Sequence, residues 1–168
     1  MPRMHALELL PDDAGCDVVR RDWQALRDAG LPSQLDHRGT TNSPNVTVVA
    51  APVLAADDEQ RVRELVVPLL PVEARAGGIG LLGGAKVSLV RLLDVPDELV
   101  RAVLDLRFGL SDVQHRGWLP HVTLARRVRH VDVPAALEVL GRRGHDDDLL
   151  TLTSLRHWDP EAGIVTTL

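Results

Sequence analysis

Two short segments with the same pattern constrain this chain most strongly. Residues 119–127 read L-P-H-V-T-L-A-R-R, and residues 43–49 read S-P-N-V-T-V-V. Each contains Pro, a polar residue, Val and Thr followed by apolar residues, which is a composition typical of β-strands. Since alternate side chains of a strand share a face, the polar residue and the Thr of each segment point to the same side. We therefore expect two strands that bury their apolar faces and offer two polar pairs to a common cleft. These pairs are Asn45 with Thr47 and His121 with Thr123.

The repeated pattern resembles the H-x-T-x motifs of the two-histidine (2H) phosphoesterase superfamily. The resemblance is closest to its 2'-5' RNA ligase-like, or RNA 2',3'-cyclic phosphodiesterase, branch. Residues 120–126 (P-H-V-T-L-A-R) match the second motif of that family. The first motif departs from it, because Asn45 stands where the family has its first catalytic histidine.

The resemblance implies a metal-independent phosphoesterase that uses no cofactor. By this resemblance His121 is one member of an acid/base pair, and Thr47 and Thr123 are phosphate-binding hydroxyls. Histidine suits this chemistry because its unperturbed pKa lies near neutrality. The implied ligand is an RNA end or a small nucleotide with a cyclic phosphate.

Asn45 cannot exchange a proton at ordinary pH, although it can hydrogen-bond a phosphate oxygen. Loss of one general acid or base costs about 10²–10⁴ in rate, so we expect impaired activity in the chain as written. Three interpretations stay open. Asn45 is a substitution introduced to trap a ligand, a natural loss that leaves a binding protein, or a change for which His37 in the preceding loop compensates.

The surroundings of the two motifs add further candidates. Residues 37–56 and 113–131 contain no carboxylate in a chain of net charge −5, which favours an anion pocket over a broad surface for nucleic acid. Arg126 is a phosphate-binding candidate, and since Arg126 and Arg127 lie on alternate faces of a strand, only one of the two can aim at the cleft. Trp118 either stacks on a nucleobase or closes the core beneath its loop. Lys86 either reaches the phosphate or lies in solvent at a sheet edge.

Hydrophobic periodicity and turn residues predict alternating strands and helices. The order favours an α+β fold in which antiparallel or mixed sheets flank a central cleft between two lobes and helices lie outside. The family resemblance implies the same bilobal arrangement, with a pseudo-twofold between the lobes. We expect strands over 4–10, 46–51, 72–76, 79–82, 86–92, 121–127, 149–158 and 164–168. We expect helices over 17–29, 57–67 (capped by Asp57), 94–108 and 132–140.

Length and composition set outer limits. A chain of 168 residues suits a single two-lobed domain over residues 1–168, which we expect to be a monomer. The lone Cys16, the absence of a long apolar run and an N-terminus unlike a signal peptide predict a cytoplasmic protein that neither crosses nor binds a membrane. We expect no metal, because the charged run 145–148 (H-D-D-D) is typical of a solvated turn.

Two alternatives to a phosphodiesterase remain at this point. The first is a non-catalytic protein of the same fold that binds a nucleotide or an RNA end. The second is a small interaction domain in which the motif strands serve only the core.

Overall fold

The computed structural model describes residues 3–142 and 148–168, and it confirms the predicted α+β class. Within these residues the helices are α1 (Asp13–Asp28), α2 (Ala56–Leu65), α3 (Asp97–Phe108) and α4 (Val133–Gly141). The strands are β1 (His5–Pro11), β2 (Val46–Ala51), β3 (Val72–Gly83), β4 (Lys86–Asp94), β5 (His121–Arg129), β6 (Leu149–Asp159) and β7 (Ile164–Thr167).

The strands form one antiparallel sheet that returns on itself. The pairings run from β2 to β1, β6, β3, β4 and β5, and β5 meets β2 again. In the described part of the chain this last contact is a single pair, Val46 with Val122. Strand β7 is added to the circuit as a hairpin partner of β6. The circuit is thus continuous everywhere except between the two motif strands, where it almost opens.

The connectivity has the predicted pseudo-twofold. The first half runs β1, α1, β2, α2, β3 and the second runs β4, α3, β5, α4, β6. Exchange of the halves maps the β1–β2 pairing onto β4–β5 and the β1–β6 pairing onto β4–β3. The β2–β5 and β3–β6 pairings map onto themselves. Each motif therefore lies on the middle strand of its half, at the junction of the lobes.

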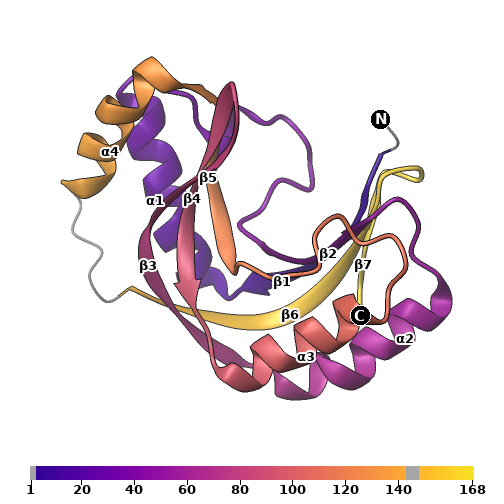
Figure 1. Ribbon diagram of the computed structural model, residues 1–168. Coiled ribbons are helices and arrows are strands. Elements are labelled where there is room, and N and C mark those ends of the chain that lie inside the picture. The colour runs from indigo at the N-terminus through magenta and orange to yellow at the C-terminus, as the bar shows by residue number, and fades with distance from the viewer. Residues whose placement is uncertain (1–2, 143–147) are drawn as a thin grey trace.

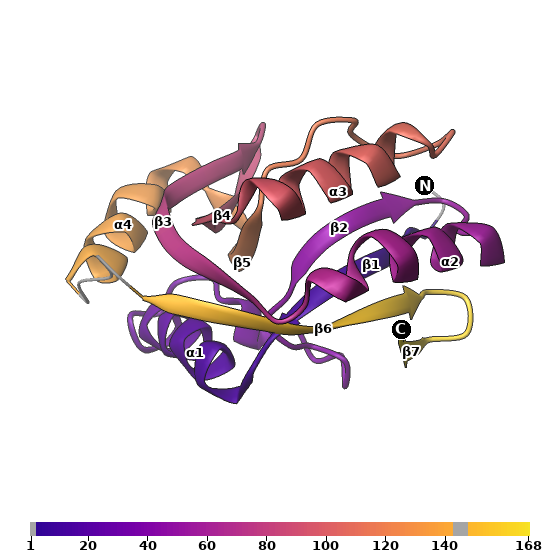
Figure 2. The same ribbon diagram turned by 90° about the horizontal axis from the view of Figure 1, so that it is seen from below.

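The helices cover this sheet in two pairs. Helix α1 packs beside α4, and α2 packs beside α3, at opposite ends of the molecule (Figures 1 and 2). Helix α1 buries Val19, Trp23 and Leu26, whose spacing of four and three residues gives one apolar stripe. The core beneath the helices consists mostly of Leu, Val and Ala.

Helices α1 and α2 start earlier than predicted because their capping groups lie earlier, whereas α3 and α4 start later, at Asp97 and Val133. Helix α1 begins at Asp13, since the Asp12 carboxylate accepts a hydrogen bond from the Gly15 amide at 2.8 Å. For α2 the prediction of Asp57 as the cap is wrong. The N-cap is Ala55, whose amide donates to the Asp58 carboxylate at 2.9 Å.

The structure has one continuous strand where the sequence predicts two short strands. Gly77 and Gly78 suggest a turn between two short strands, but β3 runs through them with a register shift between Ala76 and Ile79. A glycine pair inside a strand thus marks a bulge here. Of the predicted turn 145–148, residues 145–147 lie outside the described residues. No described helix combines the length and apolar character needed to cross a bilayer.

Candidate functional site

The two motifs meet at the Val46–Val122 pair. Continuing this antiparallel register by one residue on either side sets Thr47 opposite His121 and Asn45 opposite Thr123. All four side chains line one small cavity of about 30 Å³, which we call the polar pocket. The remaining lining residues of the polar pocket are Trp23, Gln34, Ser43 and Arg126.

A larger groove of about 800 Å³ adjoins the polar pocket. The two share four residues: Thr47, His121, Thr123 and Arg126. The volume falls within the range of small-molecule sites, about 300–1,000 Å³. The other lining residues come from β2, the end of β3 at Leu82 and Gly83, β4, Arg107 of α3 and the loop 109–120. No described residue that lines either cavity is a carboxylate, so the acid-free composition of the two motif regions recurs in the site.

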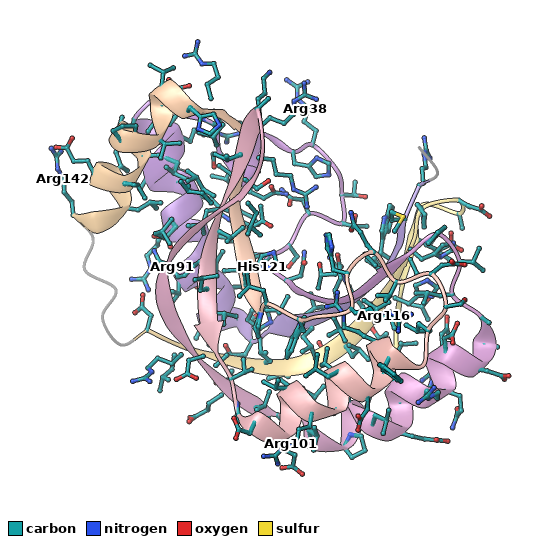
Figure 3. The ribbon with its side chains drawn as sticks, in the orientation of Figure 1. Arg38, Arg91, Arg101, Arg116, His121 and Arg142 are labelled. Carbon is teal, nitrogen blue, oxygen red and sulfur yellow. The ribbon has the colours of Figure 1, made fainter. Side chains whose placement is uncertain are left out.

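His121 is oriented by its own backbone. Its Nδ1 lies 2.6 Å from the Leu119 carbonyl oxygen, and because a carbonyl only accepts, Nδ1 carries the proton in this contact. Nε2 is the nitrogen left for proton transfer. The preceding Pro120 carbonyl accepts a hydrogen bond from the Leu93 amide at 2.9 Å, which holds the start of β5 against β4. His121 lies near the middle of the molecule in Figure 3.

The other motif side chains present complementary groups. The Thr47 and Thr123 hydroxyls make no hydrogen bond within the described residues, so both can donate to a ligand. The Asn45 amide nitrogen donates to the Ser43 carbonyl at 2.9 Å, which leaves its Oδ1 as an acceptor. The pocket therefore combines one proton-transfer group with two hydroxyl donors and one amide oxygen.

The loop 109–120 fastens to β2 where β5 diverges from it. The Trp118 indole donates to the Thr47 carbonyl at 2.9 Å, and the Gln114 amide donates to the Ala50 carbonyl at 3.1 Å. Between them Val48 is an extra residue in the β1–β2 register, a bulge that disrupts regular pairing. Trp118 is half-buried and lines the groove, so its ring both holds the loop and faces ligand space.

A site residue that sequence reasoning missed is Trp23, which the helical pattern assigns to the core alone. It is buried, yet it lines the polar pocket, and its indole donates to the Thr123 carbonyl at 2.9 Å. The neighbouring Asp22 forms a buried ion pair with Arg91 of β4, with the closest N–O distance 2.9 Å. This pair fixes α1 against the sheet and so positions Trp23. Gln34 and Ser43 were also missed, because polar loop residues carry no local signal.

The other candidate residues differ in whether they line the polar pocket or the groove. Arg126 is exposed and lines both cavities, whereas Arg127 lines neither of them. Arg127 has φ +58°, an uncommon value for a non-glycine residue, and a register shift interrupts β5 here. Lys86 and His37 are exposed, and neither lines the polar pocket or the groove. No three described His, Cys, Asp or Glu side chains gather as a metal-binding cluster.

Comparisons with known proteins identify the fold. No protein-family model and no curated protein sequence matches this chain. Among solved structures, Usb1 of Kluyveromyces marxianus, determined with uridine monophosphate, is similar with a TM-score of 0.55 and 12% identity. The alignment covers 99% of this chain and 98% of that one. A structure described as a phosphoesterase is similar with a TM-score of 0.54 and 14% identity, over 99% and 94% of the two chains. At this identity the likeness is one of fold over the whole length.

Proposed function

We propose that this chain is a phosphoesterase of the two-histidine type that binds a 2',3'-cyclic phosphate at an RNA end or on a small nucleotide. The observation that carries the proposal is the meeting of two N/H-x-T pairs in one pocket without carboxylates. The fold shared with a phosphoesterase and with a Usb1 determined with uridine monophosphate supports the same class. The proposed site residues are His121, Asn45, Thr47, Thr123 and Arg126, with Trp118 as the surface on which a base stacks.

The chemistry follows from the side chains. Opening the ring forms a bond from a water oxygen to phosphorus and breaks the bond to one ribose oxygen. His121 Nε2 either accepts the proton of the attacking water or supplies the proton of the leaving oxygen. The Thr47 and Thr123 hydroxyls and the Arg126 guanidinium stabilise the charge that builds on the phosphoryl oxygens.

Asn45 leaves the second proton transfer to solvent. We therefore expect slow turnover, lower by about 10²–10⁴ than with two positioned groups. The same substitution favours the alternative function, a non-catalytic protein that binds a nucleotide or RNA end. An amide oxygen and two hydroxyls can hold a phosphate without cleaving it.

The test is to incubate the chain and its His121→Ala variant with nucleoside 2',3'-cyclic phosphates in the presence of a chelator. Chromatography follows the nucleoside monophosphate product, and calorimetry measures binding of the cyclic substrate and of the product. Slow turnover that His121→Ala abolishes supports the enzyme. Tight binding without turnover supports the alternative function. Absence of both binding and turnover refutes the enzyme and the binding protein alike.

A further inference from the structure

Arg107, on the buried side of α3, has a guanidinium bound only to backbone oxygen atoms. It is 7% exposed. Its Nε and Nη2 donate to the His115 carbonyl, the former at 3.0 Å, and its Nη1 donates to the Val48 carbonyl at 3.2 Å. An arginine has five N–H donors. Two of them, one on each terminal nitrogen, have no acceptor in the described part of the chain.

The other buried arginines among the described residues have carboxylate partners. Arg91 pairs with Asp22 at 2.9 Å, and Arg156 pairs with Glu8 at 2.7 Å. No described carboxylate lies within ion-pair distance of Arg107. A buried charge without a counter-charge is costly, and the same burial lowers the pKa of Arg107. An external anion would therefore gain more here than at an exposed arginine.

Arg107 also lines the groove that adjoins the proposed phosphate site. It lines the groove together with Gln114 and His115, and the same groove contains His121 and Arg126. The Val48 carbonyl that it binds belongs to the residue after Thr47, about 3.3 Å further along β2. A cation without a counter-charge thus borders the proposed phosphate site, in a groove large enough for a nucleotide.

We propose that the Arg107 guanidinium, with its free N–H donors, binds a second phosphate of the ligand. This inference rests on the proposed function and narrows its substrate class. The ligand carries a phosphate besides the reacting one, either a 5'-phosphate on the same nucleoside or the preceding phosphodiester of an oligonucleotide. Arginine is well suited to this task because its planar fork matches two phosphate oxygens.

A merely structural role for Arg107, as a latch between the loop 109–120 and β2, makes a different prediction. Loss of a latch weakens every ligand alike, whereas loss of a phosphate subsite weakens only ligands that have the second phosphate. The decisive quantity is therefore a ratio of two affinities measured on the same variant, which also cancels any loss of folded protein.

The experiment compares a nucleoside 3'-phosphate, the matching 3',5'-bisphosphate and a dinucleotide with a 3'-phosphate by titration calorimetry. For the unaltered chain we expect the bisphosphate or the dinucleotide to bind about 10- to 100-fold more tightly than the monophosphate. Which of the two binds more tightly identifies the source of the second phosphate. Arg107→Gln should reduce that preference to near one, and Arg107→Lys should keep part of it because the charge remains.

Two control variants distinguish a phosphate subsite at Arg107 from a structural latch. Arg101→Gln removes an exposed arginine of the same helix that pairs with Asp97 and lies at the rim in Figure 3, and it should keep the full preference. Arg126→Gln should weaken all three ligands and keep the ratio. Equal affinity of the unaltered chain for the three ligands, or a full preference in Arg107→Gln, overturns the second subsite and leaves the proposed function standing. No binding of any of the three ligands overturns the second subsite, and turnover and binding of the cyclic phosphate decide the proposed function separately.

Discussion

The most informative perturbation of the proposed function is Asn45→His, which places an imidazole where the two-histidine motif that the sequence resembles has its first histidine. The register of β2 and β5 sets residue 45 opposite Thr123 and diagonal to His121, so both imidazoles would border the polar pocket. A second positioned acid or base is worth about 10²–10⁴ in rate. That corresponds to about 3–5 kcal/mol of activation free energy.

The structural cost of this change is smaller than the gain. Asn45 gives up one hydrogen bond, from its amide nitrogen to the Ser43 carbonyl, worth about 0.5–1.5 kcal/mol of folding stability. A domain with about 5–15 kcal/mol of stability tolerates that loss. The variant should therefore stay folded, and its increase in rate should be visible in full.

The assay is turnover of a nucleoside 2',3'-cyclic phosphate with chelator present, for Asn45→His, His121→Ala and the double variant. We expect kcat/KM to rise at least about 10²-fold in Asn45→His and to return to the starting value in the double variant. The pH profile of Asn45→His should be bell-shaped, since it then reports two groups. A folded Asn45→His protein that binds the substrate without any increase in rate would falsify the two-histidine geometry.

Two further predictions concern the elements that hold the site. Arg91→Met should lower the free energy of unfolding by about 3–5 kcal/mol in urea denaturation, because it leaves the buried Asp22 carboxylate without its guanidinium. Adding Asp22→Leu should recover most of the loss, and equal stability of the single and double variants would contradict this account. The pKa of Asp36 is lowered by the hydrogen bond from the Ser33 amide and by Arg27, so its stabilising effect is present above the unfolded Asp value near 3.9 and is lost as pH falls through the lower folded value. Carbon-13 titration of the Asp36 carboxyl checks the direction, and a midpoint at or above the ordinary value contradicts it.

The site could be predicted where it depends on strand alternation. His121 with Thr123, and Asn45 with Thr47, were each assigned to one face by a two-residue period, and all four line the polar pocket. The pseudo-twofold was expected from the family resemblance, with which the similar element content of the two halves agreed. These features are local in sequence, so they can be recognised without knowledge of tertiary contacts.

The features that could not be predicted depend on contacts between distant segments. Trp23 reaches the carbonyl of Thr123, one hundred residues away, and its helical pattern shows only that one face is buried. In the sequence Arg107 looks like any other arginine of a helix. Only the folded structure places Val48 and the loop 109–120 against its guanidinium. The bulge at Val48 likewise depends on pairing with β1.

In the described strand circuit the pairing is shortest between β2 and β5, where Val46 and Val122 form one pair. We call this junction the seam. Elsewhere in the described circuit each junction between strands is held by several residue pairs, so separating them means breaking several hydrogen bonds. Each such hydrogen bond contributes about 0.5–1.5 kcal/mol net to the stability of the fold. At the seam the described strands share one pair, and hydrogen bonds from Arg107, Gln114 and Trp118 to β2 carbonyls take the place of further strand pairing. The distance between the lobes at the site is therefore set by these loop and side-chain contacts, whereas regular strand pairing sets it around the rest of the circuit.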